Sequence, residues 1–219
     1  MENRYMGVIT GDLVTSSDGD YRGRTYREIV KTMLNEVSKH DWYNISKVES
    51  FRGDSFQITI ESPQSILEMA AFIRTYLISQ TDVYELTKLD TRLSISIEML
   101  NKYSQYNESA YEVAYILSGR NLELIQKGKK NMVFNSSHQN LMFSLSSITN
   151  LLDNTITMLS KPQVDILKEA LDIMEVNPPE LARKMEKSRQ NIHKLIDRSG
   201  TERIIESLMD CRKYITGVI

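Results

Sequence analysis

Apolar and polar positions along the first half of the chain follow the two periods that distinguish strands from helices. Short runs rich in β-branched residues predict strands at 6–10 and 93–97, and two further runs joined by a Gly-Asp turn predict a hairpin at 45–60. Apolar residues at helical spacing predict one helix after Arg24 and a second that begins near Pro63. This part of the chain therefore alternates strands with helices.

The rest of the chain continues the alternation and then becomes helical. We expect a helix at 110–117, a short strand at 132–134 and a long helix at 140–159, which contains no Gly or Pro. Elements in this order predict an α+β fold. The expected form is a ferredoxin-like or palm-like antiparallel sheet with helices on one face, followed by a small all-α helix-turn-helix domain.

A change of composition near Pro162 marks a domain boundary. The boundary falls where a polar-apolar segment gives way to a proline, which is favoured in the first turn of a helix. We predict a palm-like α+β domain at 1–138, a connecting helix at 139–160 and a helix-turn-helix DNA-binding domain at 161–219.

The C-terminal segment has the spacing of a helix-turn-helix unit. A first helix at 164–173 ends before two adjacent prolines, which begin a second helix. A tight turn at 186–188 leads into a third helix at 189–198, with Ser188 as its N-cap. A small residue, Ala182, stands on the second helix where the third would cross it.

The third helix has polar side chains on its N-terminal half, the part that contacts base edges in helix-turn-helix proteins. Gln and Asn side chains can bond adenine edges, and Arg can bond guanine. The residues that we expect to contact double-stranded DNA are Lys187, Ser188, Arg189, Gln190, Asn191, His193, Lys194 and Arg198. One alternative is an amphipathic bundle with a solvated polar face, and another is a bundle that contacts a protein partner.

The distribution of charge favours the DNA-binding interpretation. The whole chain has a net charge of -2, but 161–219 carries eleven basic and ten acidic residues against sixteen and nineteen elsewhere, which gives +1 and -3. The segment 183–198 alone has six basic and two acidic residues. A phosphate backbone attracts local positive charge of this kind. Taken alone, such a segment is more often a solvated helix face.

Two Gly-Asp steps form the other candidate site. Gly11-Asp12 closes the predicted first strand, and Gly53-Asp54 lies on the predicted hairpin. These elements are commonly neighbours in a ferredoxin-like sheet, so Asp12 and Asp54 are candidate ligands for Mg²⁺ bound together with a nucleotide. On spacing alone, two structural turns are the favoured interpretation.

Three segments together resemble the SatD family: 8–16 (VITGDLVTS), 51–57 (FRGDSFQ) and the strand at 93–97. In that family, a strand ending in Gly-Asp and a Gly-Asp hairpin precede a C-terminal helix-turn-helix. The sheet part is similar, more distantly, to class III nucleotidyl cyclases and to the palm of GGDEF enzymes. The resemblance covers nearly the whole chain through short motifs, and it implies that Asp12 and Asp54 match the two metal-binding aspartates.

The chain departs from the cyclases at the residues that stabilise their transition state. Those enzymes carry an Asn and an Arg on the helix after the fourth strand. Here Glu112 and Ile116 stand at the matching positions, and Arg120 lies one turn further on. Losing one charge-stabilising donor typically lowers the rate by about 10²–10³. We therefore expect a degenerate palm that at most senses a nucleotide and turns it over poorly or not at all.

Composition restricts the remaining classes of protein. Cys211 is the single cysteine, which excludes an internal disulfide and a cysteine-rich zinc site. The three histidines are scattered along the chain and predict neither a catalytic triad nor a histidine metal site. No apolar run approaches the roughly 20 residues that cross a bilayer, so we expect a cytoplasmic protein with no membrane partner.

Together these patterns predict a DNA-binding transcriptional regulator that acts as a homodimer on a palindromic operator. Its palm-like domain is expected to sense a nucleotide effector or to serve in dimerisation, without enzymatic activity. The alternative is an active, metal-dependent nucleotide cyclase or polymerase that a helix-turn-helix module targets to DNA.

Overall fold

The structure is a computed structural model that describes residues 5–15, 22–51, 53–100, 119, 122, 125 and 128–219. The strands are β1 (Tyr5–Thr15), β2 (Ile45–Phe51), β3 (Ser55–Ile60), β4 (Leu89–Met99) and β5 (Met132–Asn135). The helices are α1 (Arg22–Val37), α2 (Ile66–Ser79), α4 (Gln139–Met158), α5 (Lys161–Ile173), α6 (Pro178–Lys184), α7 (Arg189–Ser199) and α8 (Thr201–Val218), with 3-10 turns η1 (Asp41–Tyr43) and η2 (Pro63–Ser65). The predicted helix at 110–117 lies outside the described residues.

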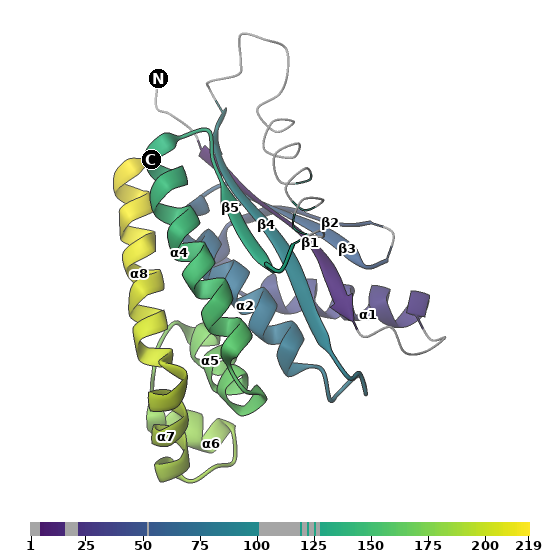
Figure 1. The fold of residues 1–219 in the computed structure, drawn as a ribbon, viewed down its shortest axis with the longest axis vertical. Coiled ribbons are helices and arrows are strands. Elements are labelled where there is room, and N and C mark those ends of the chain that lie inside the picture. The colour runs from purple at the N-terminus through teal and green to yellow at the C-terminus, as the bar shows by residue number, and fades with distance from the viewer. Residues whose placement is uncertain are drawn as a thin grey trace.

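The described strands form a five-stranded sheet in the order β2-β3-β1-β4-β5 (Figure 1). β1 lies at its centre, antiparallel to β3 and β4, and β2 is antiparallel to β3. These strands confirm the α+β prediction. β5 pairs in parallel with β4, so the sheet is mixed and not antiparallel throughout. A parallel neighbour needs a crossover of a dozen or more residues, and the chain between the two strands, 100–131, has that length.

Helices cover one face of the sheet, as predicted (Figure 1). α2 contacts β4 and α4 contacts β5; α5 packs in turn on α2, and α8 packs on α4 and α2. α1 packs beside α2. Within the described ranges, no helix combines the length and the apolar character that crossing a membrane requires.

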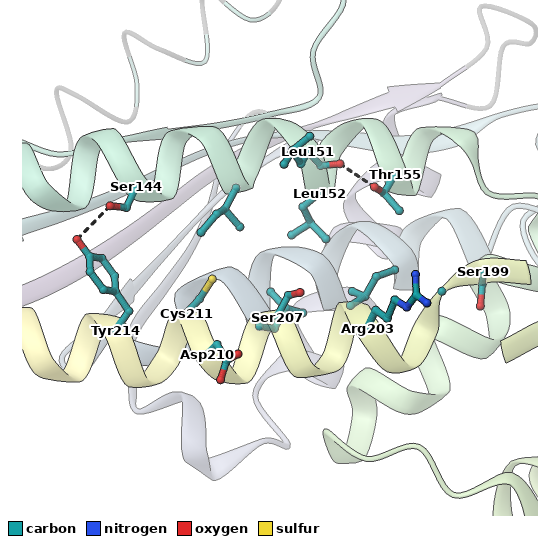
Figure 2. A pocket seen from close by; sticks show the side chains of 14 residues that line it. Ser144, Leu151, Leu152, Thr155, Ser199, Arg203, Ser207, Asp210, Cys211 and Tyr214 are labelled. Carbon is teal, nitrogen blue, oxygen red and sulfur yellow. Dashed lines mark hydrogen bonds between the residues drawn. The ribbon is translucent and has the colours of Figure 1, made fainter. Parts of the chain in front are cut away.

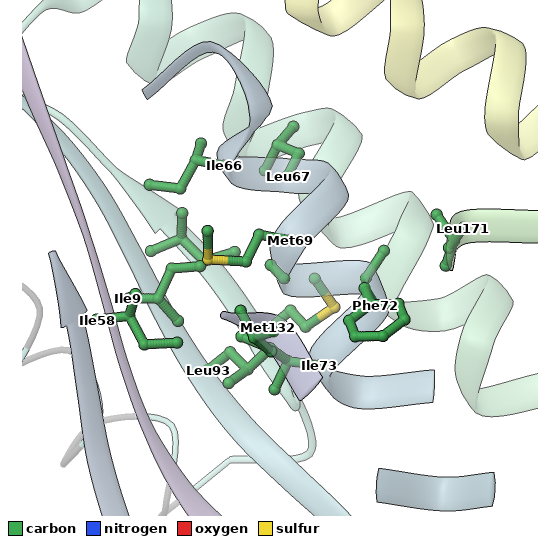
Figure 3. Close-up of a cluster of buried hydrophobic side chains, with 14 of the residues drawn as sticks. Ile9, Ile58, Ile66, Leu67, Met69, Phe72, Ile73, Leu93, Met132 and Leu171 are labelled. Atoms are coloured by element: carbon green, nitrogen blue, oxygen red, sulfur yellow. The ribbon is translucent and has the colours of Figure 1, made fainter. Parts of the chain in front are cut away.

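The sheet and the helix layer enclose a continuous apolar core (Figure 3). Ile9 and Leu93 from the sheet and Met69 from α2 are all fully buried in it. The same cluster extends to Leu171 of α5 and Leu208 of α8. Burying a side chain of this kind contributes about 1.5–3 kcal/mol. α5 and α8 therefore share the core of the sheet, although the sequence pattern assigned them to a separate domain; the boundaries themselves stay a prediction.

β1 continues past Gly11-Asp12, where the sequence pattern had predicted its end. Residues 13–15 pair with β4, whereas pairing with β3 stops at Asp12. A Cβ atom on Gly11 would lie 2.4 Å from Cζ of Phe56 and 2.9 Å from Cδ2 of Leu93. Glycine inside a strand often marks such a close approach. Gly11 therefore makes room for the Phe56 ring and does not end the strand.

A buried arginine fastens α4 to α2 and to the sheet. Arg74, on α2, donates from Nε and Nη2 to the two carboxylate oxygens of Asp90 at 2.9 and 3.0 Å, and from Nη1 to Asp153 of α4 at 2.7 Å. Side-chain and backbone N–H groups of Asn131 donate to the same two carboxylates. Burial raises the pKa of Asp153, opposed by the charge of Arg74. The helix predicted as a connector is thus part of the layer that packs on the sheet.

Candidate functional site

The two Gly-Asp steps lie side by side in the sheet. Asp12 pairs across the strands with Ser55, the residue after Asp54. The backbone N–H of Leu13 donates to the carbonyl oxygen of Asp54 at 3.0 Å. Gly53 has a φ of 92°, in the left-handed region that favours glycine. The structure therefore brings together the two steps that the sequence singled out.

The side chains at this corner are a poor fit for a pair of metal ions. Asp12 is buried, and its Oδ2 lies 3.4 Å from Nη1 of Arg92, so a cation bound there would face a guanidinium. Oδ1 of Asp54 accepts a hydrogen bond from Ser55 at 3.2 Å. Within the part of the chain that the structure describes, no three His, Cys, Asp or Glu side chains are grouped to hold a metal.

Two-metal catalysis requires carboxylates and phosphate oxygens that clamp both ions. Among the residues that the structure describes, the charge of Arg92 beside Asp12 opposes the binding of a cation there. Binding of Mg²⁺ or a nucleotide at these residues stays a prediction. Glu112, Ile116 and Arg120, where the chain departs from the cyclase pattern, lie outside the described residues.

The second candidate site is built by α5, α6 and α7. Ile192 and Ile196, on the inner face of α7, join Ile166 of α5 and Leu181 and Ala182 of α6 in a small apolar cluster. All five are buried. The methyl side chain of Ala182 leaves room for α7 to cross α6 closely. The arrangement is that of a helix-turn-helix unit, as the spacing of the sequence predicted.

Local signals determine where these helices begin and end. The side chains of Asn177 and Ser188 accept hydrogen bonds from the backbone N–H groups three residues further on, at 3.2 and 3.3 Å, which makes them N-caps of α6 and α7. Glu186, in the turn between the helices, has a φ of 52°, at a place where such turns often use Gly. Gly200, with a φ of 65°, ends α7. The third helix and its Ser188 cap are confirmed.

α7 turns its polar face to solvent. All the residues expected to contact DNA are exposed: Lys187, Ser188, Arg189, Gln190, Asn191, His193, Lys194 and Arg198. The helix is amphipathic, with the isoleucines at 192 and 196 on the opposite, buried side. Its first half presents the Arg, Gln and Asn groups that can bond base edges. Contact of any of them with DNA stays a prediction.

Acidic residues close to α6 neutralise part of the positive charge of this helix. Lys184 turns toward α5, where its Nζ lies 2.5 Å from Glu169 and 2.8 Å from Asp172. The neighbouring Arg183 is 83% exposed and lies 4.0 Å from Glu180. The charge count of the segment therefore overstates the free positive charge, because α5 neutralises Lys184.

Asp172 also links α5 to the segment that follows α1. Its Oδ1 lies 3.1 Å from Nε2 of His40, which is buried between the rings of Trp42 and Phe72. Burial lowers the pKa of His40, but the hydrogen bond and the charge of Asp172 outweigh it and the pKa is raised above 6.5. The hydrogen bond from His40, with that from Lys184, holds the pKa of Asp172 well below its usual range. This pair could not be predicted from the sequence, because its members are 132 positions apart.

Comparison with known proteins shows no family for the chain. No family model matches it, and no curated protein matches it. The crystal structure of the adenylyl cyclase CyaB from P. aeruginosa is similar at 19% identity, with a TM-score of 0.33. The match covers 44% of this chain and 57% of the cyclase chain. A likeness this weak says nothing about activity, so the α+β fold rests on the strand order and packing of the chain itself.

Proposed function

We propose that the chain is a sequence-specific DNA-binding regulator and that α7 is its reading helix. The observation that carries the proposal is the exposed polar N-terminal half of α7, whose buried face is fastened to α5 and α6. Its side chains are those that bond base edges: Arg189 for guanine, Gln190 and Asn191 for adenine. The resemblance to the SatD family supports the same combination of a palm-like sheet and a helix-turn-helix.

The placement of α7 supports entry into a groove. α6 and α7 lie at one end of the molecule, and the C-terminus lies at the other (Figure 1). The major groove is about 12 Å wide and admits one α-helix. Lys187, Lys194 and Arg198 are exposed on or next to the same helix as the base-reading side chains. Cations at these positions can neutralise phosphates on either side of the groove, and the release of counterions makes such binding sensitive to salt.

The test uses the full chain and DNA selected from a library of random duplexes. Fluorescence anisotropy then compares the wild type with a variant in which Arg189→Ala and Gln190→Ala remove two base-reading side chains. Each bidentate base contact contributes about 1–3 kcal/mol, so the variant should lose at least about tenfold in affinity for the selected duplex. Lys47→Ala, an exposed lysine on β2, is the matched control and should bind as the wild type does.

Two outcomes would overturn the proposal. One is a library from which the protein enriches no sequence. The other is equal affinity of the double variant and the control while circular dichroism shows the helices intact. A complex whose affinity does not change with salt would also argue against contact with phosphates.

The alternative of an active cyclase or polymerase is weakened by the Gly-Asp corner. Asp12 faces Arg92 at 3.4 Å, where a catalytic cation would need negative surroundings. We expect the full chain to yield no cyclic product from ATP or GTP with Mn²⁺. Product that appears with the wild type and disappears with Asp12→Asn would make the corner an active site.

A further inference from the structure

The outward face of α4 carries no charge. Asp153 is the single charged residue of this 20-residue helix, and it is buried in the ion pair with Arg74. Exposed helices of globular proteins normally place charged residues on their solvent side. A long outer face without charge is therefore unusual for a helix that faces only solvent.

Large apolar side chains stand on that face. Phe143 is 74% exposed, Leu151 70% and Met158 76%. Their spacing of eight and seven residues places them on one stripe of the helix. Single exposed apolar residues are ordinary on protein surfaces. Here three large ones share one side of the helix, and the exposed residues between them, which include Ser147, Asn150 and Asn154, are polar but uncharged.

A groove runs beside this stripe, between α4 and α8 (Figure 2). Its volume is about 660 Å³, and its floor is apolar, with Ile148 and Leu152 from α4 and Ile204, Leu208 and Cys211 from α8. Leu151 stands at the edge of the groove and belongs to both features. The same surface therefore has protruding apolar side chains and an apolar hollow, which is what a self-complementary contact requires.

The α8 side of the groove carries two opposite charges. Arg203 and Asp210 are exposed and line the groove (Figure 2). Asp210 also forms an exposed ion pair at 3.0 Å with Lys213 of its own helix, and its exposed carboxylate can accept a second cation. They are seven residues apart, or about 10 Å along the helix axis. If two α8 helices meet antiparallel about a two-fold axis between residues 206 and 207, Arg203 of each copy faces Asp210 of the other. A parallel arrangement would bring like charges together.

We propose that a second copy of this chain docks on the face formed by α4 and α8, in a two-fold dimer. The apolar stripe of each copy covers the groove of the other, and two reciprocal Arg203–Asp210 pairs flank the axis. α4 is 20 residues long, which corresponds to about 30 Å. With two helices side by side, the footprint is on the order of 600 Å², close to the roughly 800 Å² per partner of a standard interface.

This inference concerns the assembly of the protein alone and stands apart from DNA binding. Its first test is sedimentation velocity of the full chain, without DNA, over a wide range of concentration. The monomer has a mass of 25.3 kDa, and the wild type should sediment as a dimer. Leu151→Glu puts two carboxylates into the apolar contact and should raise the dissociation constant at least about tenfold. Val48→Glu, at an exposed position on β2, which lies at the edge of the sheet opposite β5 and α4, is the control and should leave the dimer unchanged.

A charge exchange tests the geometry of the contact. Arg203→Glu and Asp210→Arg should each weaken the dimer, because each places like charges across the axis. The double variant R203E/D210R restores opposite pairs and should return the dissociation constant to near the wild-type value. A fold defect would not be repaired by a second substitution of this kind.

Three results would overturn the proposal. They are a wild type that stays monomeric at every concentration, a dimer that Leu151→Glu leaves intact, and a double charge exchange that restores nothing. If a monomeric wild type binds the apolar dye anilinonaphthalene sulfonate and Leu151→Glu abolishes that binding, the groove is a site for a small apolar molecule and not an interface.

Discussion

The carboxylate of Glu68, on α2, accepts a hydrogen bond from the guanidinium of Arg212, on α8, across 144 positions of the chain. Glu68 is 1% exposed, whereas the side chain of Arg212 is 36% exposed. Burial raises the pKa of Glu68, and the hydrogen bond with Arg212 opposes that rise. The pair therefore links α8 to α2. It does so through the charge of the Glu68 carboxylate, which burial without a partner would favour in its neutral form.

Replacing Arg212 with Met should destabilise the protein in a pH-dependent way. Loss of a hydrogen bond to a charged group costs about 1.5–3 kcal/mol. Without Arg212, the folded pKa of Glu68 rises further above its unfolded value, so the folded variant binds a proton that the unfolded chain releases. The deficit in unfolding free energy should thus be larger at alkaline than at acidic pH. Urea denaturation at two pH values measures it; an equal deficit at both would mean that Glu68 does not titrate in this range.

The His40–Asp172 pair should stabilise the protein over a defined range of pH. The folded pKa of His40 is raised above 6.5, so its contribution is fully present below pH 6.5 and is lost as the pH rises through the folded pKa. The folded pKa of Asp172 is lowered, so its contribution is present above pH 3.8 and is lost as the pH falls. We expect His40→Gln to lose more stability near about pH 5 than near about pH 9. Thermal denaturation of both proteins checks this, and a loss independent of pH would contradict it.

Gly11→Ala should be tolerated only when Phe56 is made smaller. The new Cβ would stand 2.4 Å from Cζ of a ring that is fully buried. Overpacking of this kind costs about 1–3 kcal/mol. In the double variant, Phe56→Leu removes the clash with the ring and leaves the 2.9 Å contact with Leu93, so the double variant should lose less stability than the sum of the two single losses. A double-mutant cycle from chemical denaturation measures the coupling, and strict additivity would show that the ring does not require the glycine.

Ala182→Leu should impair DNA binding without touching any residue of the reading face. Ala182 is 9% exposed and lies in the cluster beneath α7. A larger side chain there forces α7 away from α6, at a cost of about 1–3 kcal/mol. We expect affinity for the selected duplex to fall, whereas Arg183→Ala, the next residue and 83% exposed, should leave the packing of α7 unchanged. Unaltered binding by the Ala182 variant would show that the crossing of the two helices is not critical.

Local chemistry explains which features the sequence predicted well. The Ser188 cap, the two prolines that begin α6 and the apolar spacing of α7 act over a few residues, so they can be read directly from the sequence. The pairing of β5 and the partners of Arg74, which lie 16 and 79 positions away, depend on contacts that no periodicity of a single sequence reveals. Gly11 is the clearest example of what the sequence does not reveal. A Gly-Asp step is typical of a turn, but here pairing with β4 continues past it, and the glycine makes room for the Phe56 ring.

The Gly-Asp corner shows a second limit of sequence reasoning. The expected fold, and not the spacing, predicted that the two Gly-Asp steps would be neighbours, and their backbones do lie side by side. That expectation contained no information on Arg92, which enters from β4 and shares the surroundings of Asp12. Whether an aspartate suits a metal ion depends on the charges of all its neighbours, and these come from strands that are distant in the chain.

Gly200 is the sole residue between α7 and α8. Ser199 and Thr201, on either side of it, are buried, and their hydroxyl groups are hydrogen-bonded to each other at 2.5 Å. The connection between α7 and α8 is therefore rigid. In a dimer formed on α8, the distance between the two α7 helices would therefore be fixed by the protein. Each base pair added between two half-sites shifts and rotates one of them by about a tenth of a helical turn. A dimer with a fixed distance between its α7 helices would bind a palindrome with a lengthened spacer more weakly, because it could not adjust to the new spacing.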